Sequence, residues 1–334
     1  MSAPTPPESV PPGVASDFPE EAPPADAPAD GGPAGEPAYD AAKLDEPLDL
    51  TDAASVVAYL HRAAELCRDQ PQRRGNSIHL GDAGRLVVTG DLHDHGPNLK
   101  RILKLADLDA GPDQHLILHE VIHGENLLQG TDLSIRTLAR VAEVKVNYPT
   151  QVHLLQSNHE LAQRLGESIL KDGVSSVDAF DDGLTYLYGQ DADEVTDAVN
   201  AYVDALALCV RCVNGVFVAH SLPAPRRIEA FDKTVIDRSL TEDDLRPKGS
   251  AYDMVWGRYH NRKITRELAE AWGASVFLLG HQPAEMGYEP LADIALILAS
   301  DHGHGQACVV DLAESYDRDQ LIERLVPLNG ISVL

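Results

Sequence analysis

Hydrophobic and polar positions follow a recurring unit from residue 51 onward, in which a short apolar run ends in a polar cluster and a helical periodicity often follows. Five such runs cover residues 85–89, 115–118, 152–155, 215–219 and 275–279. Two more, at 294–298 and 307–310, are typical of a hairpin. Short, mostly apolar runs are typical of strands buried on both faces. The pattern predicts an α/β fold with helices packed outside the sheets.

Two longer segments have the periodicity of helices. Residues 53–67 follow Thr51 and Asp52, which are residue types that cap helices. Residues 162–210 predict a helical insertion that carries acidic stretches at 178–182 and 191–194.

The first 47 residues differ from the rest in composition. They hold 12 of the 22 prolines, ten acidic residues and one lysine. Such a segment buries too little apolar surface to offset the entropy that it would lose on ordering. We therefore predict a disordered acidic tail over residues 1–47 and a folded domain over residues 48–334.

Composition and charge narrow the classes of partner. A formal net charge of −26 would repel nucleic-acid phosphates, so we expect no nucleic-acid partner. No apolar run reaches the roughly 18 to 20 residues of a membrane helix. The N-terminus also lacks the basic and apolar pattern of a signal peptide. We therefore expect a cytoplasmic protein with no membrane association.

The cysteines favour no metal knuckle. Cys209 and Cys212 have C-x-x-C spacing, but Cys67 and Cys308 are isolated and supply no second ligand pair. We expect all four to be buried free thiols.

A polar cluster follows each of the five main apolar runs. The clusters are GDLHDHG at 90–96, HEVIHG at 119–124, SNHE at 157–160, HSLP at 220–223 and GHQP at 280–283. Each one alone is also compatible with a turn or a helix cap, and Asn158 is a candidate N-cap. Ligands of α/β proteins bind beyond the carboxyl ends of strands, so the five clusters are expected to converge. Carboxylate, imidazole and amide oxygen together suit divalent manganese, iron or zinc.

In this order, the clusters resemble the motif series of the calcineurin-like metallophosphoesterases, and most closely the branch of the Ser/Thr protein phosphatases. That series runs GDxHG, GDxVDRG, GNHE, a His-Gly pair and GHxP. Residues 251–258 (AYDMVWGR) and 281–289 (HQPAEMGYE) resemble two further segments of this branch. The resemblance implies a four-layer α-β-β-α sandwich over residues 48–334. It also implies hydrolysis of a phosphorylated substrate with two divalent ions, Mn²⁺ first and Fe or Zn as alternatives.

The resemblance also implies roles for individual residues. His159 would protonate the leaving oxygen, Arg258 would clamp the phosphate, and His123 would contact the phosphate. Glu160 would support the loop that carries His159. The implied metal ligands are Asp91, His93, Glu120, Asn158, His220 and His281.

The chain departs from the family pattern at the bridging carboxylate, where it has His119 and Glu120. A gapless alignment places His119 there, and a one-residue shift places Glu120. We favour Glu120, because two close cations need anionic charge between them. Asp94 stands in place of a glycine of the first motif. Two alternatives to a phosphomonoesterase stay open: a dinucleoside polyphosphate hydrolase, and a scaffold that binds phosphate without turnover.

Overall fold

The computed structural model describes residues 39–125, 127–171 and 173–333. The predicted disordered tail lies outside the described residues as far as residue 38. From Tyr39 onward the chain is structured: residues Ala41–Asp45 form a short 3-10 helix, and the Tyr39 hydroxyl donates to the Glu65 carboxylate at 3.1 Å. The described structure therefore begins nine residues before the predicted domain boundary at residue 48.

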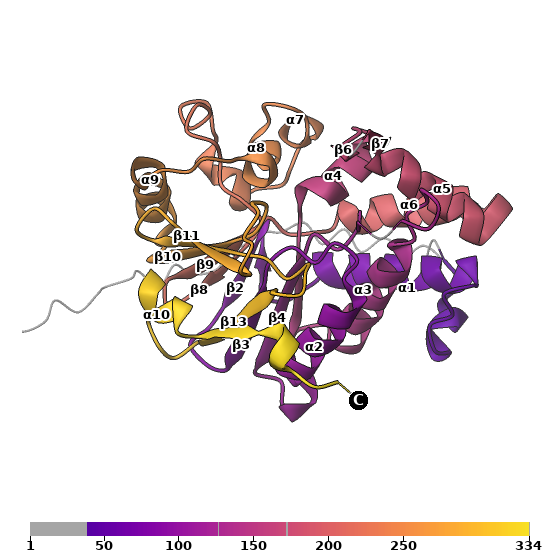
Figure 1. Cartoon of the computed structure of the whole chain (residues 1–334), viewed down its shortest axis with the longest axis horizontal. Helices are drawn as coiled ribbons and strands as arrows, with labels where there is room; N and C mark the ends of the chain where they lie inside the picture. Colours follow the sequence, from indigo (N-terminus) through magenta and orange to yellow (C-terminus); the bar gives the residue numbers. More distant parts are fainter. Residues whose placement is uncertain (1–38, 126, 172, 334) are drawn as a thin grey trace, which may run out of the picture. The chain divides into compact units, whose positions relative to one another are not determined.

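Two sheets form the centre of the fold (Figure 1). The larger sheet contains, in spatial order, β1 (Arg73–Arg74), β2 (Ser77–Leu80), β8 (Cys209–Cys212), β9 (Val216–Ala219), β10 (Val276–Leu279), β12 (Ala295–Leu298) and β11 (Tyr288–Leu291). The smaller sheet contains β14 (Leu325–Pro327), β13 (Gln306–Asp311), β3 (Arg85–Thr89), β4 (Gln114–His119) and β5 (Val152–Leu155). A separate hairpin pairs β6 (Leu170–Lys171) with β7 (Val174–Ser175).

The two sheets pack face to face through their apolar side chains. Leu86 and Val88 of β3 belong to the same buried cluster as Val216 and Val218 of β9. The intervening Val87 belongs to a different cluster, which lies on the helix-covered side. Successive side chains of a strand point to opposite faces, so an apolar run that is buried throughout must be covered on both.

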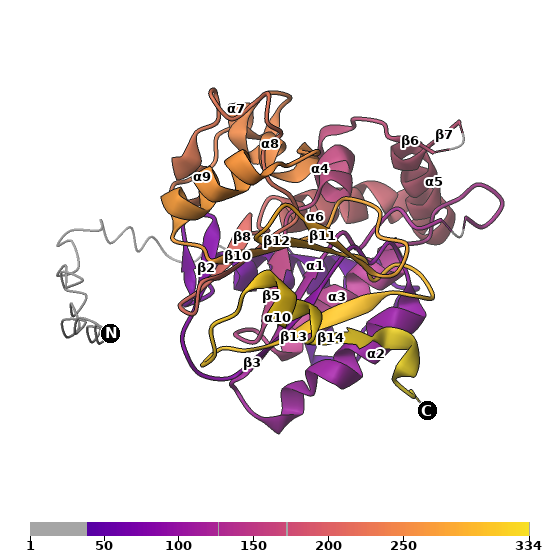
Figure 2. The ribbon, with the colours of Figure 1, turned by 60° about the vertical axis from the view of Figure 1, so that its left-hand side comes forward.

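Helices cover both outer faces (Figure 2). The smaller sheet is covered by a large layer that shares one core cluster: α1 (Ala53–Arg68), α2 (Gly96–Ala106), α3 (Ile135–Asn147), α5 (Ser176–Tyr188) and α6 (Ala192–Val203). The larger sheet is covered by α8 (Ser250–Trp256) and α9 (Arg262–Trp272). The predicted four-layer α-β-β-α sandwich is confirmed. The remaining α-helices are α4 (Asn158–Leu165), α7 (Glu242–Leu245) and α10 (Arg318–Ile322), and further 3-10 turns lie at Leu108–Ala110, Gly189–Asp191, Lys233–Ile236 and Leu328–Gly330.

The segment predicted as a helical insertion is an integral part of the helical layer. It contains α5 and α6, and α6 packs directly against α1. Its side chains Phe180, Val199 and Tyr202 are almost fully buried in the core that covers the smaller sheet. The predicted start of the first helix is also observed, since the Asp52 carboxylate accepts from the Ala54 N–H at 3.2 Å.

The C-x-x-C pair does not form a metal knuckle. Cys209 packs with the helices that cover the larger sheet, whereas Cys212 packs between the two sheets. Residues three apart on a strand point to opposite faces, so these thiols cannot bind one ion together. All four cysteines are buried and free, as the sequence predicted. Within the described residues, no helix has the length and apolar character needed to cross a membrane.

The sheet topology sets the position of the polar clusters. Strands β3, β4 and β5 are parallel to one another, as are β9, β10 and β12. Just beyond β3, Asp91 forms a parallel bridge with Ala299, which follows β12. The backbones approach closely at Gly90, where a Cβ atom would lie 2.0 Å from the Leu298 carbonyl oxygen. The carboxyl ends of the parallel strands of both sheets therefore meet at one edge.

Candidate metal centre

Asp91 and His281 join the two sheets at this edge. Asp91 follows β3, His281 follows β10, and both oxygens of the Asp91 carboxylate accept from the His281 backbone N–H at 2.9 Å. The contact requires the glycine of the GHQP cluster, because a Cβ atom at Gly280 would lie 2.2 Å from Asp91 Oδ1. Asp91 is 7% exposed and His281 is 4% exposed, so both side chains are largely withdrawn from bulk water.

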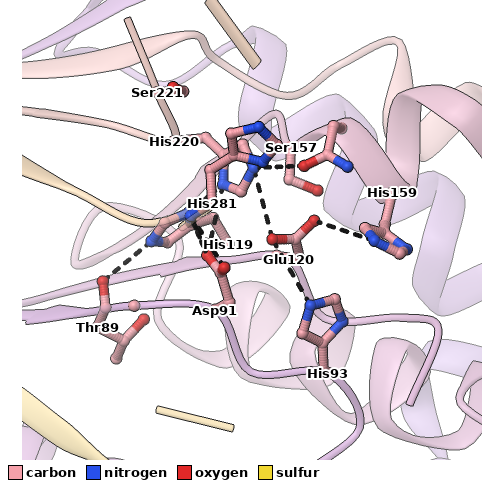
Figure 3. Close-up of polar contacts among 12 residues, drawn as sticks. Thr89, Asp91, His93, His119, Glu120, Ser157, His159, His220, Ser221 and His281 are labelled. Carbon is pink, nitrogen blue, oxygen red and sulfur yellow. Dashed lines mark hydrogen bonds and ion pairs between the residues drawn. The ribbon is translucent and has the colours of Figure 1, made fainter. Parts of the chain in front are cut away.

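Glu120 lies at the centre of the cluster (Figure 3). Its Oε2 atom is 3.4 Å from His220 Nε2 and 3.8 Å from His93 Nε2, and its Oε1 atom is 3.9 Å from His159 Nε2. The two longer separations exceed hydrogen-bond distance, and all three fall in the range of about 3–4 Å between ligand atoms that share one ion at about 2 Å. Glu120 Oε1 is buried and has no hydrogen-bond partner among the described residues. The geometry therefore fits a carboxylate that binds cations.

Three overlapping groups of ligand atoms lie within 4.8 Å of one another in the described part of the chain. The groups are Asp91 with His119 and His220, His93 with Glu120 and His159, and Glu120 with His220 and His281. Glu120 is shared by two groups, one on the His93 side and one on the His220 side. This is the position expected of a carboxylate that lies between two ions.

Three of these residues have backbone angles that non-glycine residues seldom adopt. The φ angles are +42° at His93, +49° at Glu120 and +67° at His281. Such conformations cost free energy and persist where the surrounding structure enforces them, often at functional sites. At this edge they turn each side chain toward the centre of the cluster immediately after the strand or turn that precedes it.

A chain of histidines forms the buried wall of the site. His119 Nε2 lies 3.0 Å from the Thr89 carbonyl, His119 Nδ1 lies 3.0 Å from His220 Nδ1, and His220 Nε2 lies 2.7 Å from Asn158 Oδ1. These three contacts need three protons, whereas two neutral imidazoles carry two. Either the Asn158 amide turns over and donates, or a cation replaces the proton between His220 and Asn158. In the second arrangement, His220 Nε2 and Asn158 Oδ1 each offer a lone pair to the cation.

Burial favours the neutral forms of the carboxyl and imidazole groups in the cluster. A bound cation would counteract this effect at the carboxyl groups. Burial raises the pKa of Asp91 to about 7 and, together with the charge of Asp91, raises the pKa of Glu120 well above its ordinary value. Burial lowers the pKa of His119 to about 4 and that of His281 to about 3, and the charge of Arg258 adds to the shift at His281. His119 and His281 are therefore neutral, which is the form of histidine that binds metals. A bound cation would keep the carboxylates ionised.

Arg258 contacts a predicted metal ligand directly. Its Nε–H donates to His281 Nε2 at 3.0 Å. A single lone pair cannot serve a guanidinium and a metal ion at once. Coordination of a metal ion through this nitrogen therefore requires the guanidinium to move away from it.

His159 is held by residues behind it. Its Nδ1 lies 2.9 Å from His123 Nδ1, and His123 Nε2 lies 3.0 Å from Gln163 Oε1. The Gln163 amide donates to Asp181 at 2.8 Å, which orients its oxygen toward His123. His123 Nε2 therefore donates, and a neutral His123 accepts from His159 Nδ1–H through its other nitrogen. This leaves His159 Nε2 directed at the Glu120 carboxylate.

Glu160 connects the loop that leads to His123 with the segment that carries His159. Its carboxylate accepts from the Val121 N–H at 2.6 Å and from the Ile122 N–H at 3.3 Å, and it also accepts from the Ser157 hydroxyl. Burial raises its pKa to about 7. The N-cap of α4 is Ser157 and not Asn158, so the Asn158 side chain points to the site instead.

The cluster opens into a cavity of about 390 Å³. Its lining includes seven of the nine residues that the sequence assigned to the site: Asp91, His93, Glu120, Asn158, His159, Arg258 and His281. His220 is fully buried behind it and still reaches Glu120. His123 is 1% exposed, is not among the described lining residues of this cavity, and lies behind His159 through the contact between their Nδ1 atoms.

From the sequence, His119 is expected only as an alternative to Glu120 in the bridging position. The structure places it beside Asp91 and His220, 1% exposed, with the bonds described above. The signal in the sequence was its position as the last residue of an apolar run, next to Glu120. It was overlooked as a supporting residue because its contact with His220 joins residues about a hundred positions apart.

No protein-family profile matches the chain. A probable serine/threonine-protein phosphatase of Encephalitozoon cuniculi is 22% identical over 228 residues, which cover 64% of this chain and 46% of that protein. The chain therefore spans about half the length of this curated relative.

Two solved structures share the fold. A protein serine/threonine phosphatase from Saccharomyces cerevisiae aligns with a TM-score of 0.53 at 15% identity, covering 78% of this chain and 82% of that one. A cold-active protein-tyrosine phosphatase from a psychrophilic Shewanella species aligns with a TM-score of 0.55 at 13% identity, covering 80% and 82%. The α/β sandwich of this chain is thus a fold shared with known phosphatases.

Proposed function

We propose that this protein is a metal-dependent phosphoester hydrolase that uses a dinuclear centre and acts on phosphomonoesters, as Ser/Thr protein phosphatases do. The observation that carries the proposal is the position of Glu120, buried between His93 on one side and His220 on the other. The similarity to phosphatases in sequence and fold gives the reaction class.

The donor set fits divalent ions. Asp91 and His93 would hold one ion, Asn158, His220 and His281 would hold the other, and Glu120 would be shared. Bound there, such ions supply an activated water and neutralise phosphate charge. Manganese suits this mixture of oxygen and imidazole ligands, and iron and zinc are the alternatives.

The other residues of the cavity would act on the substrate. Arg258 would hold two phosphate oxygens with its guanidinium. His159, protonated at Nε2, would give its proton to the leaving oxygen, while His123 accepts from Nδ1 and keeps the ring in place. Arg258 and His159 line the same cavity as Asp91 and Glu120, so one bound phosphoryl group can reach all four side chains.

The test combines metal analysis with turnover. The purified chain is expected to bind close to two equivalents of manganese by elemental analysis after dialysis. It is also expected to release nitrophenol from para-nitrophenyl phosphate only when a divalent ion is present. A protein that neither binds nor turns over with manganese, iron or zinc would contradict the proposal. Binding of only one ion would contradict the bridging role of Glu120 but not the rest of the proposal.

A further inference from the structure

Acidic residues that line the cavity carry charge of the same sign as a phosphate and opposite to that of arginine or lysine. Three of the described lining residues lie outside the ligand cluster and are acidic, namely Glu125, Glu285 and Asp301. Among the described residues that line the cavity, Arg258 is the single arginine or lysine. Glu125 and Glu285 are exposed, so their charges face the solvent that an arriving substrate crosses.

The acidic residues come from loops of both sheets. Glu125 belongs to the loop that follows β4 of the smaller sheet. Glu285 follows the cluster that carries His281, and Asp301 follows β12 of the larger sheet. Loops of both sheets therefore contribute carboxylates to the lining of this cavity.

With cations bound at the ligand cluster, the same cavity would attract anions. Arg258 lies there, and the buried Glu120 oxygen without a hydrogen-bond partner identifies a place for a cation. A phosphoryl group would thus bind at the floor, while groups attached to it would extend between the three carboxylates. Because Glu125 and Glu285 are exposed, added salt should weaken their attraction or repulsion of such groups.

We propose that this acidic rim, defined as Glu125, Glu285 and Asp301, selects phosphomonoesters that carry positive charge next to the phosphate, such as phosphopeptides with flanking arginine or lysine. The inference rests on the proposed function and names its substrate class. Additional phosphates would extend into the rim and be repelled, so dinucleoside polyphosphates are disfavoured substrates. The recognised feature is the charge that flanks the phosphate, whichever residue bears the phosphate.

The experiment compares two phosphothreonine peptides of equal length, one flanked by arginines and one by aspartates, together with a dinucleoside tetraphosphate. With manganese and at low ionic strength, kcat/KM for the arginine peptide is expected to exceed that for the aspartate peptide by about tenfold, as for a few exposed ion pairs. The ratio should fall as salt is added. A ratio near one, or fastest hydrolysis of the tetraphosphate, would overturn the inference.

Substitutions assign the preference to the rim. The triple variant Glu125→Gln, Glu285→Gln, Asp301→Asn is expected to reduce the ratio to about twofold, because neutral amides keep the shape and lose the charge. The matched control Asp182→Asn, Glu229→Gln, Glu270→Gln removes the same charge from exposed positions that are not among the lining residues of the cavity, and should keep the full ratio. Equal ratios in the two triple variants would contradict the assignment.

Binding separates this inference from the proposed function. Fluorescence anisotropy of the same labelled peptides reports the charge preference even if no phosphate is released. Absence of hydrolysis with a retained preference for the arginine peptide would contradict the proposed function and support the rim. Hydrolysis of para-nitrophenyl phosphate without any charge preference would support the function and contradict the rim.

Discussion

Two buried polar clusters lie at opposite ends of strands β4 and β5, and they differ in how completely their hydrogen bonds are satisfied. At the amino ends, Lys145 of α3 is 0% exposed, and its ammonium group donates to Gln70 at 2.8 Å, to the Pro149 carbonyl at 2.6 Å and to the Val152 carbonyl at 2.9 Å. At the carboxyl ends, Glu120 is buried beside Asp91 and leaves one oxygen without a hydrogen-bond partner among the described residues.

The difference separates a structural cluster from a ligand site. An ammonium has three protons, and all three are used by Lys145, so nothing further is needed there. Buried polar groups in folded proteins are nearly always satisfied, and an exception calls for a ligand or a function. Substitutions in the two clusters should therefore have different effects. A substitution at Lys145 should lower stability and leave turnover unchanged, whereas a substitution at Glu120 should lower turnover and leave stability unchanged.

The largest effect is expected for Glu120→Gln. The amide keeps the size of the side chain but removes the charge between the two ligand groups. Metal affinity and kcat/KM should fall by more than about 100-fold, which is the range that supporting residues alone reach. The free energy of unfolding of the metal-free chain should not decrease, because a neutral amide replaces a carboxyl group whose ionisation is opposed by burial. His119→Ala is the control for the bridging role; metal loss confined to that variant would assign the bridge to His119.

His159→Asn should lower kcat by about 100-fold, the low end for loss of a positioned general acid. Metal content should stay at the wild-type level, since the imidazole is assigned to proton transfer. Elemental analysis beside steady-state kinetics checks both statements. An unchanged kcat would refute the acid role, and loss of metal would make His159 a ligand.

Lys145→Met should destabilise the fold by about 3 kcal/mol, because two carbonyls and the Gln70 amide lose their donor in a buried environment. Urea unfolding measures the free energy, and kcat of the folded fraction should stay within about twofold of wild type, since this cluster lies at the other end of the strands. A variant with normal stability and impaired turnover would remove the distinction between the two clusters.

Metal should stabilise the chain more at neutral than at acidic pH. The folded-state pKa values of Asp91 and Glu160 are about 7, above the ordinary values of 3.8 and 4.5. The metal-free chain therefore loses stability as pH rises from about 4 to about 7, because the folded state holds the protons more tightly. A bound metal ion that keeps Asp91 ionised would remove part of this loss of stability. The increase in Tm on adding manganese, measured by calorimetry against EDTA, should be several degrees larger at pH 7.5 than at pH 5. An equal increase at both values would argue against metal at Asp91.

The smallest effect is expected for His123→Ala. Loss of the acceptor behind His159 should reduce kcat by about tenfold while KM changes little, because supporting residues typically contribute 10–100-fold. His123→Asp, which restores an acceptor for the same N–H, should recover part of kcat. A rise in KM with unchanged kcat would instead place His123 in contact with the phosphate, as the sequence had suggested.

Much of this arrangement could be predicted from the sequence, because the signals were local. Apolar runs such as 85–89 and 152–155 are strands that need covering on both faces, and they correspond to β3 and β5. The polar clusters directly after them contain the residues that meet at the sandwich edge. The glycines in GDLH and GHQP are now explained by close backbone approach at Gly90 and by the Asp91 carboxylate at Gly280.

The rest depended on contacts between distant parts of the chain. The strands β1 and β2, with Ser77–Leu80 next to β8, were not predicted, because one contains charged residues and the other is short and mixed. The position of His123 followed from Gln163 and Asp181, which lie on two helices beyond its loop. The placement of α6 against α1 likewise has no signal within either helix.

The packing of α6 on α1 has a consequence for synthesis of the protein. The apolar face of α1, which includes Val56, Leu60 and Ala63, is synthesised well before α6, because the helix that covers part of this face ends only at Val203. At roughly 5–20 residues per second, the ribosome needs on the order of ten seconds to make the intervening chain. During that interval this surface is available to chaperones or to neighbouring nascent chains. The helical layer, and with it the support behind His159, can be completed only after that delay.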